Sequence, residues 1–459
     1  MPASREARTI LSVQLENPEE SLEASEGKSC KGGGNYRYVI LGLAFLITLV
    51  NYMDRASISY AIGPIKKEFG IDDSQFGVVL AAFGVGYAVM TLGGGIIVDR
   101  WGARKVWPAA AIAWSGFTAL MGCVVGFPAL LSLRIMLGLS EGPHFPALTR
   151  VVADWLPQTE RVRATGLGLC AVPLASAIGA PLISTLIITV GWKAMFLVMA
   201  SAGIVWAGIW YIMFRDYPDS STFVSESELR HIHEGQTHDR SITDEERRAR
   251  NRNDGGTTWR DMLTNPALIS NNIAYFAFGY SLFFALTWLP GYLEHSHNVK
   301  LEDARFILIA PWLTAAILLP VAGFLSDWLW IKTGSKQVSR SYLICICQLI
   351  SGLSYVPLLF NPPLATSMLF ISLGVGFGMM PNAAFYAINC DLAKDRAATS
   401  QGLMNCCSAI ASIMAPALTG FIAARTNSFA GAFALLIFFT LVSVISVGLV
   451  QRLDSKAAP

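Results

Sequence analysis

The chain has 459 residues, of which 53% are hydrophobic and only 14% are charged. A soluble protein carries about 25% charged residues, so this composition excludes a soluble globular fold and indicates an integral membrane protein. The formal net charge of +2 offers no basic surface for nucleic acid, and the eight cysteines lack the CxxC spacing of zinc or redox sites.

Apolar runs long enough to cross a bilayer as helices, about 20 residues each, recur along the sequence. We predict roughly twelve such spans. They lie near residues 38–62, 75–98, 105–125, 128–155, 163–190, 193–214, 267–293, 303–330, 341–360, 364–392, 398–424 and 429–450. The hydrophilic stretch 215–266 divides them into six-helix bundles at 38–214 and 267–452. The polar tails 1–37 and 453–459 flank them, and the first is expected to be disordered, not a signal peptide, because it lacks an apolar segment.

Lysine and arginine in the loops are concentrated on one side of the predicted spans. Arg100, Arg104 and Lys336 belong to that side, whereas the opposite side carries fewer cations, among them Lys66 and Lys300. By the positive-inside rule, we expect both termini and the central loop to be cytoplasmic. The sequence contains no Asn-x-Ser/Thr sequon, which favours a bacterial inner membrane over a glycosylated cell surface.

The span at 38–62 contains two adjacent charged residues, Asp54 and Arg55. A charge in the hydrocarbon region costs at least about 2.5 kcal/mol and usually marks a functional site. Glu141 lies near the middle of the fourth span, so we expect it to meet Arg55, either as a working ion pair or as a static packing pair. Neighbouring helical residues point about 100° apart, so Asp54 and Arg55 cannot share one partner. His144, one turn from Glu141, is either a proton relay or a packing residue.

A Gly-x-x-x-Asp pattern closes the second and eighth spans, at Gly95 to Asp99 and at Gly323 to Asp327. Its repetition at equivalent places indicates a duplicated bundle, an arrangement typical of transporters that bind substrate between two halves. An aspartate at a helix end opposite arginines can form a latch that breaks between two conformations. We assign this latch to Asp99, Arg100, Arg104 and Asp327.

These motifs resemble the major facilitator superfamily, whose signature between the second and third spans is similar to residues 95–105. A closer resemblance is to its anion:cation symporter family, which contains hexonate and hexuronate permeases and sialin-type carriers. The stretches that carry it are residues 51–57, 141–146, 154–161 and 287–290. The resemblance implies an all-α fold of twelve transmembrane helices in two pseudo-symmetric bundles.

The resemblance also implies roles for particular residues. Arg55 would bind the substrate carboxylate, while Asp54 and Glu141 would carry protons. Tyr275 stands where galactonate-type members have glutamine, and the tenth span has few hydroxyls, which favours a more apolar or aromatic carboxylate over a sugar acid. The residues expected to contact substrate are Tyr52, Arg55, Tyr87, Tyr275 and Asn405. For the tyrosines, ordinary helix packing is the alternative.

We therefore expect a secondary active transporter, not an enzyme, that imports an organic carboxylate with protons by alternating access and works as a monomer in the lipid bilayer. No cofactor is expected, and His295 and His297 lack a third ligand for a metal. Sodium-coupled uptake and an efflux antiporter remain alternatives, although the antiporter motif is only partly present at 179–181. A membrane sensor or membrane enzyme is disfavoured because the central loop is too short and too charged to bury a core.

Overall fold

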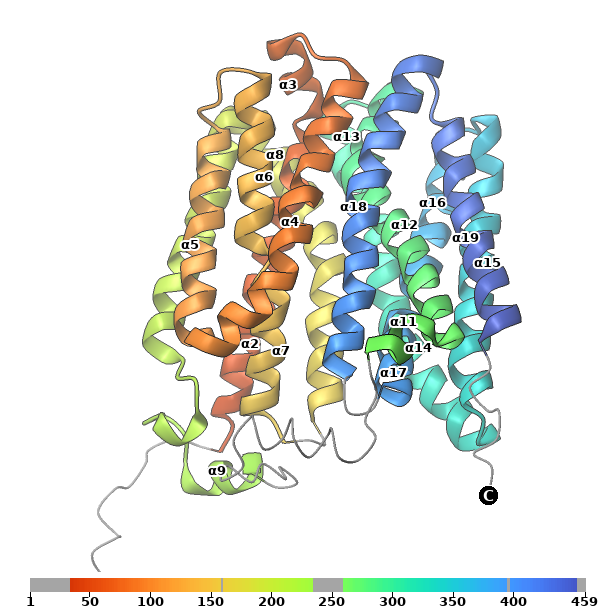
Figure 1. Ribbon diagram of the computed structural model, residues 1–459. Helices are drawn as coiled ribbons and strands as arrows, with labels where there is room; N and C mark the ends of the chain where they lie inside the picture. Colours follow the sequence, from red (N-terminus) through yellow and green to blue (C-terminus); the bar gives the residue numbers. More distant parts are fainter. Residues whose placement is uncertain (1–33, 158–159, 234–258, 394–396, 452–459) are drawn as a thin grey trace, which may run out of the picture.

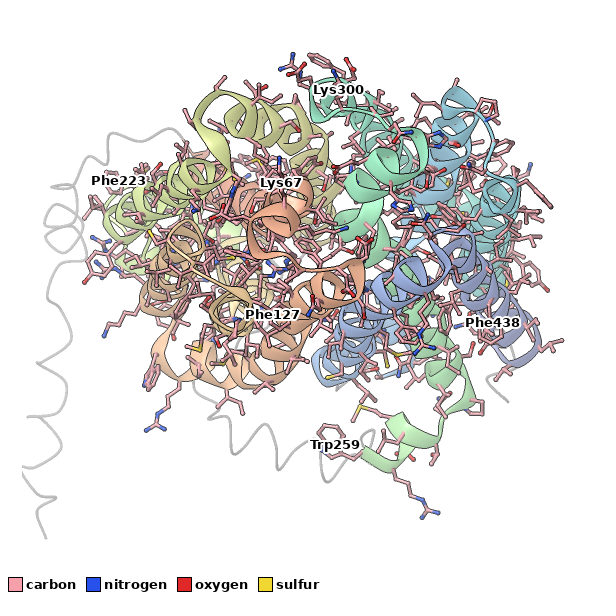
Figure 2. All side chains as sticks on the ribbon, turned by 90° about the horizontal axis from the view of Figure 1, so that it is seen from above. Lys67, Phe127, Phe223, Trp259, Lys300 and Phe438 are labelled. Carbon is pink, nitrogen blue, oxygen red and sulfur yellow. The ribbon has the colours of Figure 1, made fainter. Side chains whose placement is uncertain are left out.

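The computed structural model describes residues 34–157, 160–233, 259–393 and 397–451, and every regular element in these ranges is helical. Figure 1 shows the helices up to α8 on one side of the molecule and those from α12 onward on the other. The start of α2 and α9 lie at one end of the molecule, and α3 lies at the opposite end, which we call the α3 end. Figure 2 looks down on the α3 end, where Lys67 and Lys300 lie, and shows Phe438 at the outer edge.

The first half of the chain supplies the helices of the N-terminal bundle. They are α2 (Tyr36–Tyr60), α3 (Ile62–Phe69), α4 (Asp73–Trp101), α5 (Ala103–Met121), α6 (Phe127–Glu141), α7 (His144–Trp155) and α8 (Arg161–Met213). At 53 residues α8 is too long for one crossing, and Gly191, with φ 83° and ψ 160°, breaks it into two. Glycine tolerates this positive φ without the steric penalty of a side chain.

The second half supplies the C-terminal bundle. Its helices are α12 (Pro266–His297), α13 (Leu301–Ile307), α14 (Ile309–Thr333), η3 (Gln337–Tyr342), α15 (Leu343–Tyr355), η4 (Val356–Phe360), α16 (Leu364–Met379), α17 (Asn382–Leu392), α18 (Ala397–Thr426) and α19 (Ala430–Val450). The connection between the bundles contributes η2 (Pro218–Ser220), α9 (Glu226–His233) and α11 (Trp259–Thr264). Within the described residues, nine helical stretches are long and apolar enough to cross a membrane.

Two of the predicted single spans are broken at a proline in the structure. The fourth divides into α6 and α7 at Gly142 and Pro143, and the tenth divides into α16 and α17 at Pro381. Proline has no N–H to donate and clashes with the preceding turn, which explains both breaks. The nine apolar stretches count α8 once and leave out α5 and the α6–α7 pair. When α5 and the α6–α7 pair are added and α8 is counted as two crossings, the described helices make twelve crossings, as the sequence predicts.

Local sequence signals set the starts of two helices that later contribute to the site. Asp72 and Gln75 form a reciprocal capping box at the start of α4, with N–H to oxygen distances of 2.7 and 3.1 Å. At α12, the Asn265 side chain accepts from the Ala267 backbone N–H at 2.9 Å, and Pro266 occupies the first helical position. These caps fix where each long helix enters the membrane.

Glycines allow α4 and α6 to pack with their backbones almost in contact. A Cβ atom on Gly138 would overlap the carbonyl oxygen of Phe83, and a Cβ on Gly86 would overlap that of Ile135. In membranes, helices associate through such close van der Waals packing. Burial of apolar surface does not favour their association, because the surrounding lipid is equally apolar. The close approach brings the α4 side chains beside Glu141, at the end of α6.

The two bundles meet through α4 with α18, α2 with α12, and α8 with α13 and α14. At the α3 end, a Cβ on Gly77 of α4 would lie 2.8 Å from the carbonyl oxygen of Pro416 on α18. Arg305 also donates across the bundles to the hydroxyl of Thr185 at 3.2 Å. These contacts hold the bundles together at the α3 end.

Arg37, at the start of α2, ties this helix to α9 and to the turn before α8. Its backbone N–H donates to Glu228 at 2.9 Å, and its guanidinium donates to both oxygens of Glu160 at 3.1 and 3.2 Å. His231 of α9 lies 3.2 Å from the same carboxylate. Burial alone would raise the pKa of Glu160, but the hydrogen bonds from Arg37 and His231 hold it below its usual value of 4.5.

We expect Gly138→Ala to destabilise the protein by about 1–3 kcal/mol, because the added methyl group meets backbone of α4 that cannot move aside. The loss of stability is measured as a lower midpoint of thermal unfolding in detergent. Gly116→Ala is the matched control, since nothing lies within 4 Å of a Cβ at that position. Alanine is the better helix former, so the control should be as stable as the wild type or more so. Equal losses in both variants would contradict the close packing.

Glu160→Gln tests the cluster that joins α2 and α9. Because the folded-state pKa of Glu160 is lowered, its stabilising effect is complete above the unfolded value of 4.5 and disappears as the pH falls through the folded value. We therefore expect Glu160→Gln to unfold at lower temperature than wild type near neutral pH, with a difference that shrinks in acid. Glu226→Gln, at an exposed position of α9, is the control. A difference that is independent of pH would exclude this ionic contribution.

Candidate functional site

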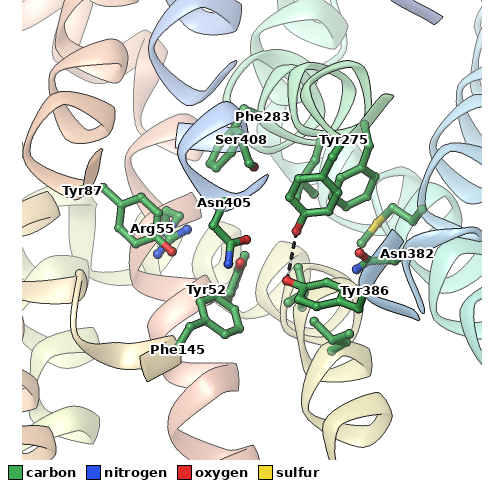
Figure 3. A pocket seen from close by; sticks show the side chains of 15 residues that line it. Tyr52, Arg55, Tyr87, Phe145, Tyr275, Phe283, Asn382, Tyr386, Asn405 and Ser408 are labelled. Atoms are coloured by element: carbon green, nitrogen blue, oxygen red, sulfur yellow. Dashed lines mark hydrogen bonds between the residues drawn. The ribbon is translucent and has the colours of Figure 1, made fainter. Parts of the chain in front are cut away.

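A small cavity lies between the two bundles, lined by both of them (Figure 3). Its lining residues are Tyr52, Arg55, Tyr87, Phe145, Leu169, Val172, Tyr275, Phe278, Leu282, Phe283, Met379, Asn382, Tyr386, Asn405 and Ser408. The cavity volume is ≈ 50 Å³. That is room for about two water molecules at roughly 30 Å³ each, so the bundles are nearly closed around it in this conformation.

The structure brings together all the residues predicted to contact substrate: Tyr52, Arg55, Tyr87, Tyr275 and Asn405 line the same cavity. Sequence reasoning missed Phe145 and Tyr386, which also line it. Tyr386 lies four residues after Asn382 and therefore on nearly the same face of α17, whereas Phe145 lies beyond the break between α6 and α7, where the spacing from Glu141 no longer defines a helix face. The spacing from the polar Asn382 was a usable signal for Tyr386.

Arg55 and Glu141 form a buried ion pair at the cavity wall. The Nε and Nη2 groups of Arg55 donate to Glu141 Oε2 at 3.1 and 2.7 Å. Nη2 also lies 3.4 Å from the side-chain oxygen of Asn51. The Arg55 side chain is 4% exposed and that of Glu141 is 0% exposed, so water screens this pair very little.

Three aromatic rings surround the Arg55 guanidinium. Its central carbon lies 4.6 Å from the ring centroids of Tyr52 and Phe83, and 4.7 Å from that of Tyr87. The faces of aromatic rings attract cations, most strongly where water is excluded. The rings therefore stabilise a charged guanidinium at this position, and Glu141 Oε2 supplies the neutralising charge.

Asp54 is fully buried beside this pair but does not join it. Among the described residues, neither of its carboxylate oxygens has a hydrogen-bond partner. Its separation from Arg55 follows the geometry expected for neighbouring helical residues. Burying an unpaired carboxylate costs several kcal/mol, so the surroundings of Asp54 favour the neutral acid.

His144 lies behind the cavity, in a group of aromatic rings. The indole N–H of Trp107 donates to His144 Nδ1 at 3.2 Å, which assigns the proton of the neutral imidazole to Nε2. The rings of Trp107, Trp114 and Phe145 lie 5.5, 6.1 and 5.0 Å from the imidazole. His144 is 0% exposed and does not line the cavity, an arrangement that fits a packing residue.

The predicted latch lies partly outside the described residues, because the side chains of Asp99 and Asp327 are not among them. Arg100 is exposed. The backbone N–H of Arg104 donates to Asp216 at 2.8 Å, and the Arg104 guanidinium lies 5.1 Å from the Tyr211 ring centroid. Asp216 thus satisfies a free N–H at the start of α5.

His295 and His297 have separate partners in the structure. His295 Nε2 lies 3.3 Å from the Asn427 carbonyl oxygen, and His297 Nε2 lies 3.1 Å from the Tyr292 hydroxyl. Across the described part of the chain, no three His, Cys, Asp or Glu side chains gather as a metal site would require. The two histidines belong to the α3 end of α12 and not to the cavity.

Residues 44–416 match the model of the Major Facilitator Superfamily, so this chain belongs to that superfamily of membrane transporters. It is 30% identical to the hexuronate transporter of Bacillus subtilis over 402 residues, which is 86% of this chain and 90% of that protein. It is 32% identical to the probable galactarate/D-glucarate transporter of Bacillus subtilis over 436 residues, 92% of this chain and 94% of that protein. It is also 30% identical to the probable sulfoacetate transporter of Cupriavidus necator, covering 86% and 89% of the two chains.

The fold is similar to that of a solved bacterial homolog of the human lysosomal transporter Spinster. In its inward-facing, occupied conformation, that structure matches with a TM-score of 0.73 at 17% identity, over 93% of this chain and 100% of the other. The predicted superfamily, its twelve-helix fold and the resemblance to hexuronate-type permeases are confirmed by these matches. The chain is a transporter and not an enzyme.

We expect His144 to contribute to packing and not to proton exchange. In His144→Asn, the amide oxygen can still accept the Trp107 N–H, whereas His144→Phe leaves this donor unpaired at a cost of about 1–3 kcal/mol. The phenylalanine variant should therefore unfold at the lower temperature. Uptake into proteoliposomes should keep the wild-type pH dependence in both variants. A displaced pH midpoint in His144→Asn would instead show that the imidazole exchanges protons.

Proposed function

We propose that this protein imports an organic anion with a carboxylate group, in symport with protons. The observation that carries the proposal is the Arg55–Glu141 ion pair, because Arg55 lines the cavity between the bundles and Glu141 is its ion-pair partner there. Relatives named as transporters of hexuronate, galactarate/D-glucarate and sulfoacetate support an anionic substrate.

Competition for Arg55 provides the coupling. While Glu141 is ionised, it accepts both hydrogen bonds from Nε and Nη2 of Arg55, and an incoming carboxylate would meet a neutralised guanidinium. When Glu141 takes up a proton, the ion pair is lost and the guanidinium needs a new counter-charge. The substrate carboxylate supplies it, so proton and anion enter the site together.

Asp54 is the second proton carrier in this proposal. It lies one residue from Arg55, and its surroundings favour the neutral acid in the present conformation. Ionisation would require a nearby donor or water, which a different arrangement of the bundles can supply. Asp54 would then release its proton in one conformation and regain it in another.

Alternating access requires the bundles to rock around the cavity. We propose 38–214 and 267–452 as the two moving bodies, joined by a cytoplasmic connection at 215–266, with cytoplasmic tails at 1–37 and 453–459. Parts of the connection and most of both tails lie outside the described residues. The Asp99 and Asp327 latch with Arg100 and Arg104 would act at the cytoplasmic end, in a bacterial inner membrane. One chain supplies both walls of the cavity, which supports a monomeric transporter.

Opening toward the other side of the membrane would separate the contacts at the α3 end. There, Gly77 of α4 faces α18 and Arg305 donates to Thr185 across the bundles. Beside them the buried rings of Phe76 on α4 and Trp288 on α12 meet edge to face with centroids 6.3 Å apart, so apolar surface would also be exposed when the bundles part there. The α3 end is the periplasmic gate in this proposal.

Glu141→Gln separates binding from coupling. The amide cannot ionise, so the variant should still exchange labelled substrate across proteoliposomes but should fail to accumulate it under an inward proton gradient. The experiment uses whichever carboxylate the wild type accumulates, and Glu226→Gln on exposed α9 serves as the control for both activities. Retained accumulation in Glu141→Gln would overturn its role as proton carrier. If the wild type accumulates substrate only under a sodium gradient, the coupling ion is sodium and not the proton. If the wild type transports substrate only outward, the efflux antiporter is the better assignment.

A further inference from the structure

Across the cavity from Arg55, the wall is built from a pair of tyrosines. The hydroxyls of Tyr275 on α12 and Tyr386 on α17 are hydrogen-bonded at 3.1 Å, and their rings meet edge to face at a centroid distance of 5.9 Å (Figure 3). Because each hydroxyl is partly satisfied by the other, the pair contributes mainly ring surface to the site. Tyr275 also contacts Phe278, with ring centroids 5.1 Å apart.

The remaining rings around the cavity come from both bundles. Phe145 of the N-terminal bundle and Phe283 of the C-terminal bundle line it, so rings are present on opposite walls. Phenylalanine offers no hydrogen bond to a sugar hydroxyl, whereas its ring packs well against another ring in an offset or edge-to-face arrangement. The space of ≈ 50 Å³ between these walls is well below the roughly 150 Å³ of a cavity that holds benzene, so the bundles must part to admit any substrate, and the rings then line its faces.

The charge of the cavity fits a substrate with one anionic group. Among the residues that line it, Arg55 carries the single positive charge, and the C-terminal wall is uncharged. Arg134 is buried nearby, 5.0 Å from the Phe83 ring centroid, but it does not line the cavity. A second carboxylate on the substrate would therefore be buried against a neutral wall without a partner.

Asn382 supplies a free acceptor at this neutral wall. Its side-chain oxygen is buried and has no donor within the described residues, and the residue is 5% exposed. A buried acceptor without a partner is costly unless a ligand or water satisfies it. A hydroxyl group on the substrate, remote from its carboxylate, would donate to this oxygen.

Resting on the proposed transport function, we propose that the substrate is a hydroxylated aromatic monocarboxylate, held by Arg55 at its carboxylate and by the Tyr275–Tyr386 pair at its ring. Sugar acids lack the planar ring that these walls fit. Aromatic dicarboxylates have the ring but carry one anionic group too many. Tyr275 and Tyr386 are thus specificity-determining residues of the transport site.

The test is equilibrium binding to the purified full-length protein in detergent at mildly acidic pH, followed by tryptophan fluorescence. The probes are 4-hydroxybenzoate, benzoate, D-galacturonate and terephthalate, which separate the hydroxyl, the ring and the second charge. We expect 4-hydroxybenzoate to bind at least about tenfold more tightly than D-galacturonate or terephthalate. Tighter binding of either competitor, or no binding of any probe, would overturn the assignment.

Variants of Tyr275 and Asn382 test which residues cause the preference for 4-hydroxybenzoate. Tyr275→Leu should weaken 4-hydroxybenzoate binding about tenfold, while Tyr275→Phe, which keeps the ring, should bind nearly as wild type does. Asn382→Leu should abolish the preference for 4-hydroxybenzoate over benzoate. Thermal unfolding of each variant shows whether it is folded, and an unchanged affinity in folded Tyr275→Leu would contradict the role of the wall.

Uptake into proteoliposomes then distinguishes the two proposals. If D-galacturonate is accumulated with protons and 4-hydroxybenzoate does not bind, the substrate class is wrong while proton-coupled anion transport stands. If 4-hydroxybenzoate binds in an Arg55-dependent way but no proton gradient drives its uptake, the substrate class stands and the coupling fails. Arg55→Ala provides the control for binding at this cavity.

Discussion

A guanidinium and a carboxylate in the apolar middle of a membrane protein must compensate each other, and this constraint organises the site. Neither Arg55 nor Glu141 could be buried alone without a cost of several kcal/mol. Close packing of α4 against α6 brings the caging rings of Phe83 and Tyr87 to the pair. The Arg55–Glu141 pair is thereby shielded from water and carries no net charge. If one partner gains or loses its charge, another ion must neutralise the other partner.

The same constraint connects the local chemistry to the motion of the bundles. The ion pair belongs entirely to the N-terminal bundle, whereas the wall opposite Arg55 comes from α12 and α17 of the C-terminal bundle. A substrate that replaces Glu141 as the partner of Arg55 would touch both bundles at once. Occupancy of the site can therefore favour one relative position of the bundles over another, which is the requirement for coupled alternating access.

The charged part of the site could be predicted from the sequence, because Arg55 and Glu141 interrupt apolar spans and such interruptions are rare. Tyr386 and Phe145 escaped prediction because aromatic residues in membrane helices are usually packing residues. Only Tyr386 has a regular helical spacing from a polar neighbour, since a break separates Phe145 from Glu141. The breaks at Pro143 and Pro381 were visible as prolines, but hydropathy alone merges the two pieces of each span. Docking of α9 through Arg37 and Glu228 joins positions 191 residues apart, which no local pattern encodes.

The most direct test of the account is proton uptake on substrate binding, measured in weakly buffered solution with purified wild-type protein. If the anion takes the place of ionised Glu141 on Arg55, binding near neutral pH should remove about one proton from solution per anion bound, and less as the pH falls and Glu141 is already protonated. Binding without proton uptake at any pH would show that Glu141 stays ionised beside Arg55. The pair would then be a fixed element of packing, and the coupling would have to lie elsewhere.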